Sequence, residues 1–142
     1  MDEERLREII VEKAPDAVMF ADRDGVIQLW NEGAEWIFGV AKAEALGRSL
    51  DLIIPERLRA RHWQGYRQTM ATGETRYGRQ LLRVPALKGD GEQFSSEFSI
   101  VLVQDDSGKP LGVAAILRDV SGQWQREKEL KERIAALEAG RK

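Results

Sequence analysis

One histidine is the side chain in this sequence whose type and position most suggest a ligand for a metal-containing cofactor. His62 lies in residues 55–72, where apolar and aromatic residues recur at helical spacing. The residues that share its predicted helix face are Leu58, Tyr66, Thr69 and Met70. A neutral imidazole on an apolar helix face, with an aromatic residue one turn away, suits the axial position of haem iron. The same pattern also fits a buried histidine that bonds a backbone carbonyl, or one exposed at a pocket mouth.

The remaining composition argues against a catalytic site. The 142-residue chain has one histidine and no cysteine, which excludes thiolate metal sites, cysteine nucleophiles and cysteinyl–flavin photochemistry. Paired carboxylates at suggestive spacing and glycine-rich phosphate loops are absent as well, so we expect no enzyme activity. A flavin remains an alternative cofactor, because four tryptophans could line a pocket or stack on it. Of these, we expect Trp36 to lie in the core and Trp63 at the surface or an interface.

Charge and hydropathy exclude two classes of partner. With 22 basic and 24 acidic residues the net charge is -2, which predicts neither nucleic-acid nor membrane binding. Four arginines in the segment around His62 are interpreted as a solvated patch that pairs with Asp and Glu; they are Arg57, Arg59, Arg61 and Arg67. No segment approaches the roughly 20 apolar residues of a membrane span. The acidic start of the chain is unlike a signal peptide, so we expect a cytoplasmic protein.

The elements that must position His62 begin with a helix, a hairpin and short helices. Their predicted ranges are a helix over 2–13, strands at 17–21 and 26–30 around an Asp-Gly turn, and short helices at 32–38 and 40–47. Asn31 is a suitable N-cap for the first short helix, and Gly39 is a suitable stop. The long helix carrying His62 is predicted to open at Pro55 and to end at Gly73.

Three strands are predicted after the long helix, at 79–87, 93–104 and 111–119. In the middle strand, Phe94, Phe98, Ile100 and Leu102 alternate with Ser95, Glu97 and Ser99, which predicts one buried face of an antiparallel sheet. Pro85 predicts a partly unpaired or bulged position. Beyond residue 121 the chain is strongly helical and amphipathic. The predicted class is α+β, with a five-stranded antiparallel sheet and helices packed on one face.

Several motifs in this order resemble the PAS family over residues 14–121. The segments that carry the resemblance are AVMFADRDGVIQLWNEGAEWIF at 17–38, GRSLDLIIP at 47–55, KGDG at 88–91 and RDVS at 118–121. The resemblance implies a PAS fold and a sensory input domain for signal transduction, such as a two-component system. It also implies a flanking helix at 1–13 and a signalling helix at 122–142. We expect a homodimer through these helices, coupled to a downstream kinase or other effector domain.

A closer resemblance covers residues 55–78, PERLRARHWQGYRQTMATGETRYG. It is similar to the helix of haem-binding PAS domains, both FixL-type oxygen sensors and oxygen-sensing phosphodiesterases. The resemblance implies haem b with His62 as the proximal iron ligand, followed by Tyr66, and a small diatomic gas as the signal. It further implies that Arg76 contacts a propionate and that Phe98 and Ile100 face the distal side.

One position departs from the FixL-type pattern. Leu82 stands where those domains carry an arginine that bonds oxygen or a propionate, with Gln80 two residues earlier on the same face. Arg79 and Arg83 should point the other way. Without that arginine, bound oxygen loses a charge-assisted hydrogen bond, ordinarily worth about 1.5–3 kcal/mol, unless Gln80 supplies it. The alternative function is a haem-free PAS module for small-ligand binding or dimerisation.

Overall fold

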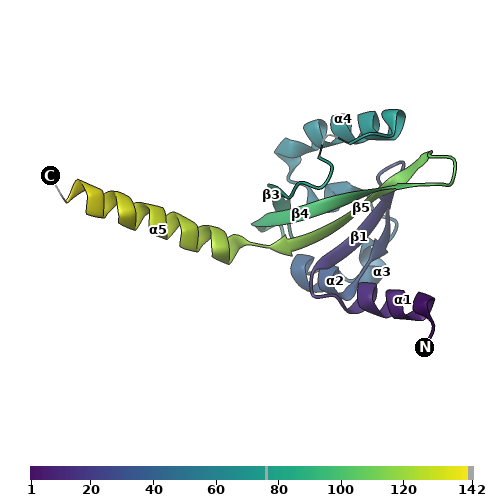
Figure 1. The fold of residues 1–142 in the computed structure, drawn as a ribbon, viewed down its shortest axis with the longest axis horizontal. Helices are drawn as coiled ribbons and strands as arrows, with labels where there is room; N and C mark the ends of the chain where they lie inside the picture. Colours follow the sequence, from purple (N-terminus) through teal and green to yellow (C-terminus); the bar gives the residue numbers. More distant parts are fainter. Residues whose placement is uncertain (76, 141–142) are drawn as a thin grey trace.

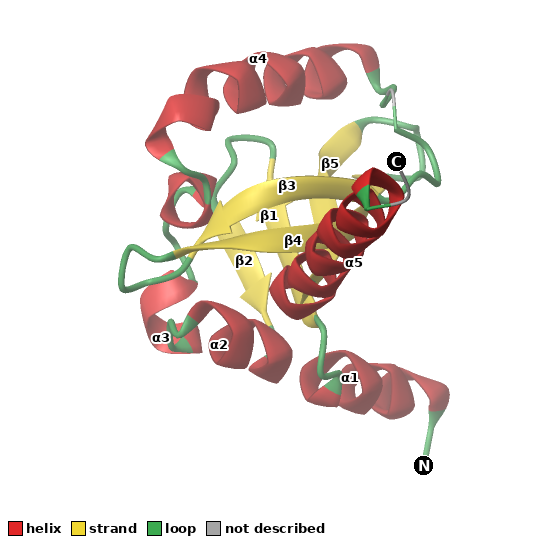
Figure 2. Ribbon diagram, turned by 90° about the vertical axis from the view of Figure 1, so that its left-hand side faces the viewer, coloured by secondary structure: helices red, strands yellow, loops and turns green. Residues whose placement is uncertain are grey.

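The computed structural model describes residues 1–75 and 77–140, which form an antiparallel sheet, helices across one of its faces, and a long terminal helix that projects away (Figures 1 and 2). The elements in chain order are α1 (Glu3–Lys13), β1 (Ala17–Asp22), β2 (Ile27–Trp30), α2 (Glu32–Phe38), α3 (Lys42–Ala45), the 3-10 helix η1 (Leu50–Ile53), α4 (Glu56–Thr72), β3 (Leu82–Leu87), β4 (Gln93–Gln104), β5 (Pro110–Asp119) and α5 (Ser121–Ala139). The five strands are ordered β2-β1-β5-β4-β3. The predicted α+β class with a five-stranded antiparallel sheet is therefore confirmed.

The boundaries of α2 and α4 fall where the capping residues predicted them, whereas the helix predicted over 40–47 covers only Lys42–Ala45. The side chain of Asn31 caps α2 by accepting a hydrogen bond from the Ala34 N–H at 2.9 Å. Gly39 ends α2 and Gly73 ends α4, with φ angles of 69° and 72° respectively. These left-handed angles suit glycine, which has no Cβ to clash with the backbone. The long helix that carries His62 therefore has the predicted end and begins within one residue of the predicted start.

The alternation predicted for β4 places its apolar residues on the inner face of the sheet. Phe98 lies opposite Leu82 on β3 and opposite Leu117 on β5. Leu117 in turn lies opposite Ala17 of β1, and both are buried. The same face carries the main hydrophobic core, which includes Met19, Ile27, Trp30, Phe38, Met70 and Phe94. The helices α2, α3 and α4 all contribute residues to this core.

The start of the predicted β3 strand is wrong, and of the two alternatives at Pro85 the partly unpaired strand is confirmed and the bulge is not. The strand begins at Leu82 rather than Arg79, because the Gln80 N–H bonds the Tyr77 carbonyl at 2.8 Å in a preceding turn. There is also no bulge at Pro85, which lies opposite Ser95 in an unbroken register. Proline is tolerated there because β3 is an edge strand, where one side of the backbone has no neighbouring strand to bond.

The predicted positions of two tryptophans are reversed. Trp36 is 87% exposed, because Ala34 and Phe38 hold the inward side of α2 and a residue halfway between them points outward. Trp63 is half-buried and packs against the core instead of lying at the surface. Its indole covers Gly25 in the turn between β1 and β2, where there is no room for a side chain.

Replacing Gly25 with alanine should lower the free energy of unfolding by about 2–4 kcal/mol. Gly25 has a φ of 77°, and an added Cβ would overlap the Trp63 ring. The backbone strain should cost about 1–2 kcal/mol, and displacement of the indole should add a similar amount. Gly39→Ala is the matched control, because Gly39 has a φ of 69° but open space around its Cα, so only the strain should appear. Equal losses in urea unfolding would contradict the packing of Trp63 on this turn.

Candidate functional site

His62 lies on the inner side of α4, half-buried between two aromatic rings. Its ring centroid is 4.8 Å from that of Trp63 and 5.7 Å from that of Tyr66. The Nδ1 atom is buried and has no hydrogen-bond partner among the residues that the structure describes. A buried polar atom without a partner costs about 1–3 kcal/mol, so this imidazole is unusual among protein interiors.

Burial sets the protonation state of His62. Removal from water lowers the pKa of the imidazole, and the more weakly acting charge of Asp51 only partly opposes this shift. Because the unperturbed pKa of histidine is already near 6.5, the ring is neutral at pH 7. A neutral imidazole is the form that donates an electron pair to a metal.

Two anchored side chains fix the helix around His62. The Tyr66 hydroxyl contacts the backbone carbonyls of Asp22 at 2.6 Å and Ala21 at 3.1 Å, and so ties α4 to β1. Burial raises the pKa of Tyr66 to about 12, which keeps this hydroxyl protonated as a donor. The Trp63 indole N–H donates to the Asp51 carboxylate at 2.7 Å. Tyr66 thus anchors the helix through its hydroxyl, and its ring borders His62.

Three of the predicted site residues form an apolar surface on the inner face of β3 and β4. Leu82 and Phe98 are cross-strand partners, and Ile100 follows on the same side of β4. All three are only half-buried, and their register puts them on the core face of the sheet, to which α4 contributes Tyr66 and Met70. The structure therefore places His62 and Tyr66 on the inner side of α4, and Leu82, Phe98 and Ile100 on the inner face of the sheet.

One predicted site residue does not join this arrangement. Gln80 is exposed and lies in the turn before β3, so it does not share a strand face with Leu82 as expected. The turn formed by the Gln80 N–H and the Tyr77 carbonyl shortens the strand and removes that alternation. Arg76 lies outside the described residues. The expectation that Arg83 points away from the site is confirmed, because it lies next to Leu82 on the opposite face of β3.

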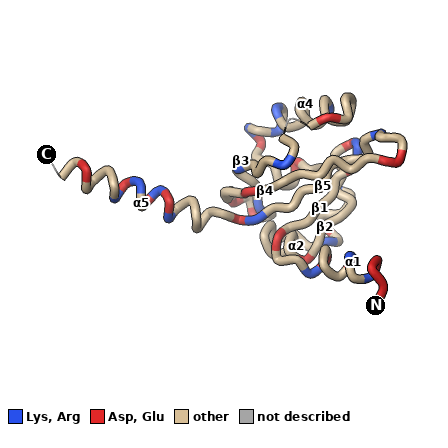
Figure 3. The backbone as a smooth tube through the Cα atoms, in the orientation of Figure 1, with Lys and Arg blue, Asp and Glu red and all other residues tan. Residues whose placement is uncertain are grey.

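The arginines of α4 pair with acids less than the sequence suggested. Arg59 approaches the Asp51 carboxylate at 3.8 Å and donates to the Ile54 carbonyl at 3.0 Å. Within residues 1–75 and 77–140, no ion pair joins Arg57, Arg61 or Arg67 to an acidic side chain. Figure 3 shows basic and acidic residues interspersed along the chain.

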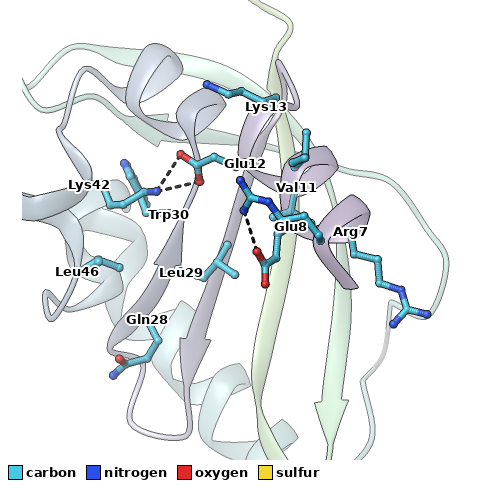
Figure 4. Close-up of a pocket in the computed structure, with 12 residues that line it drawn as sticks. Arg7, Glu8, Val11, Glu12, Lys13, Gln28, Leu29, Trp30, Lys42 and Leu46 are labelled. Atoms are coloured by element: carbon cyan, nitrogen blue, oxygen red, sulfur yellow. Dashed lines mark hydrogen bonds and ion pairs between the residues drawn. The ribbon is translucent and has the colours of Figure 1, made fainter. Parts of the chain in front are cut away.

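A groove of about 590 Å³ lies elsewhere, between α1, β2 and α3 (Figure 4). Leu29 and Trp30 contribute to its lining, and the Lys42 ammonium binds the Glu12 carboxylate at 2.8 Å. A second ion pair, Lys13 to Glu32 at 2.9 Å, joins α1 to α2. None of the predicted site residues that the structure describes lines this groove, which is the junction where α1 attaches to the domain.

The sequence pattern of the family described as PAS fold matches residues 11–124. The chain belongs to the PAS family. Among its relatives, the sensor protein FixL of Bradyrhizobium diazoefficiens is 32% identical over 87% of this chain. The oxygen sensor protein DosP of Escherichia coli is 26% identical over 86% of it. This PAS domain spans only 24% and 15% of the lengths of those two relatives.

Solved structures support the same fold. The PAS domain of a Colwellia psychrerythraea protein superposes with a TM-score of 0.74 at 21% sequence identity, covering 85% of this chain and 99% of that one. The chain is thus a PAS sensory domain of the kind found in signalling proteins. PAS domains are in general non-catalytic modules. In the described part of the chain, no helix has the length and apolar character needed to cross a membrane.

Proposed function

We propose that this PAS domain binds haem b through His62 and reports the gas-bound or redox state of the haem. The observation that carries the proposal is the neutral, half-buried imidazole whose Nδ1 atom has no partner within the described structure. A bound group that engages the ring would offset the cost of burying it. The similarity to FixL, named as a sensor protein, and to DosP, named as an oxygen sensor protein, supports a sensory role for this domain.

Several residues around His62 support haem as the bound group. His62 is the residue that would hold the iron, and the rings of Trp63 and Tyr66 restrict its orientation. Leu82, Phe98 and Ile100 would form the apolar wall that excludes water from the bound group. Haem would supply an iron centre that binds small diatomic gases or changes redox state. Arg76 as a propionate contact stays a prediction, whereas Gln80 has no role in the proposal.

Ligand discrimination follows from the apolar wall. Leu82 has no hydrogen-bond donor to offer, so a gas that depends on a charged donor gains nothing from this position. We therefore propose a sensor of gas or redox state in which oxygen has no special advantage over other diatomic ligands. The haem-free PAS module and a flavin-binding domain are the alternatives that the same experiment addresses.

The output of the sensor is proposed to pass through the flanking helices. Residues 14–121 would sense, and the segment 122–142, through α5, would carry the signal to a kinase or other effector domain in the cytoplasm. Three apolar residues on α5 support a dimer seam, because Leu130, Ile134 and Leu137 are 55%, 54% and 64% exposed. Such residues, spaced four and three apart, are typical of helices that pair with a second helix.

Titration with hemin under reducing conditions tests this function. We expect saturable uptake of one haem per chain, seen as a Soret band, together with quenching of tryptophan fluorescence from Trp63. The matched control is Arg61→Ala, an exposed position beside His62, which should take up hemin as the parent protein does. Absence of saturable uptake would contradict the proposal and leave the haem-free module. A yellow flavin spectrum in freshly purified protein would contradict it in favour of flavin.

A further inference from the structure

Helix α5 leaves the sheet through two backbone contacts to one residue of β4. The Val120 N–H donates to the Ser95 carbonyl at 2.9 Å, and the Ser95 N–H donates to the Ser121 hydroxyl at 3.0 Å. Beyond this first turn the helix extends away from the domain (Figure 1). Its direction relative to the sheet therefore depends on whatever holds its second turn.

A single arginine on the edge strand reaches that second turn. Arg83 of β3 donates from Nε to the Glu97 carboxylate of β4 at 2.9 Å. Its Nη1 atom lies 3.5 Å from the Glu127 carboxylate of α5. Within the described part of the chain, no other ion pair joins the sheet to α5. Arg83 is therefore a charged bridge between two strands and the terminal helix.

The two faces of β3 connect this bridge to the site. Leu82 points to the inner face, toward the side on which α4 lies, while the next residue, Arg83, points to the outer face. Because β3 is the edge strand, it is hydrogen-bonded only to β4 and has less to restrain it than an interior strand. A displacement at Leu82 moves the backbone of Arg83 with it, since the two residues share a peptide bond.

We propose that Arg83 is the positioning residue that couples the inner face of β3 to the direction of α5; this rests on the proposed function for the ligand that displaces Leu82. The guanidinium suits the task because its planar fork bonds two carboxylates in fixed directions. Glu97, whose side chain is 17% exposed, holds the guanidinium at the sheet. The contact of Arg83 with Glu127, which is 44% exposed, is the one that breaks when β3 moves.

The bridge itself is tested without any ligand. Arg83→Ala and Glu127→Ala should each raise amide hydrogen exchange in residues 124–130 by about two- to five-fold, as expected for an ion pair of this exposure. The double variant should exchange no faster than either single one, because both remove the same contact. Arg118→Ala is the matched control, because Arg118 pairs with Asp16 at 2.9 Å and does not reach α5. Unchanged exchange in Arg83→Ala, or additive effects in the double variant, would overturn the proposal.

The coupling is tested with hemin as the probe. In the parent protein, hemin should change the exchange of residues 124–130, and in Arg83→Ala this change should disappear while the Soret titration and the melting temperature stay the same. A merely structural role for Arg83 would move stability but leave the hemin-dependent change in place, which would overturn the coupling. If no Soret band forms in the parent protein, the proposed function fails instead, and the ligand-free comparison still decides whether the bridge holds α5.

Discussion

Replacing His62 with alanine is expected to lower the affinity for hemin more than about 100-fold while the protein stays folded. Even partners that only orient a metal ligand contribute about 10–100-fold to metal affinity, so loss of the ligand itself should exceed that range. His62 lies on a helix in which alanine is well tolerated, and its Nδ1 atom makes no hydrogen bond in the described structure, so little stability is at stake. Titration of both proteins with hemin measures the difference.

The alternative interpretation of His62 makes the opposite prediction. If the imidazole is only a core residue, the alanine variant should bind hemin as weakly or as strongly as the parent protein. Its main effect would then be a change in unfolding free energy from the cavity left behind. An alanine variant with unchanged hemin affinity would therefore contradict the role of His62, even if the domain did bind haem elsewhere.

Replacing Asn31 with alanine should lower the free energy of unfolding by about 3–5 kcal/mol. The side chain is 1% exposed, and its Oδ1 atom accepts hydrogen bonds from the Val18 and Ala34 N–H groups at 2.8 and 2.9 Å. Its amide nitrogen contacts three further backbone carbonyls, those of Val11, Ala14 and Asp16. Losing the cap costs about 1 kcal/mol, and each buried group left without a partner adds about 1–3 kcal/mol.

Asp2 provides the matched control for Asn31. Its carboxylate caps the exposed helix α1 by accepting a hydrogen bond from the Arg5 N–H at 2.7 Å. Asp2→Ala removes the same local motif without burying anything, so the loss should stay within about 1 kcal/mol. Urea unfolding of both variants provides the comparison. If Asn31→Ala lowered the free energy of unfolding as little as Asp2→Ala, this would contradict the claim that the hydrogen bonds of Asn31 join α1, β1 and α2.

Local chemistry predicted the parts of the fold that depend on single residues. The Asn31 cap, the Gly39 and Gly73 stops and the alternation of β4 all depend on backbone geometry that the residue type itself imposes. The predicted start of β3 was wrong because a backbone hydrogen bond from the Gln80 N–H to the Tyr77 carbonyl forms a turn there. No pattern of side chains reveals such a bond. The predicted burial of Trp36 was wrong because Ala34 and Phe38 already occupy the inward side of the short helix α2.

The candidate site was predicted only in part, for a similar reason. Helical spacing placed His62 and Tyr66 on the inner side of α4, and strand alternation placed Phe98 and Ile100 on the inner face of β4. The anchor from Trp63 to Asp51 and the bridge from Arg83 to Glu97 and Glu127 join segments far apart in the chain. Such contacts depend on strand register and helix direction, which a single sequence does not specify.

The most direct test of the central claim is the visible spectrum of a His62→Gly variant with hemin, before and after imidazole is added. We expect no Soret band of the bound type without imidazole, and recovery of the parent spectrum with it, because imidazole replaces only the missing ring. The Arg61→Ala variant should respond to imidazole no differently from the parent protein. A glycine variant that binds hemin unaided with the parent spectrum would contradict the claim that His62 holds the haem of this PAS domain.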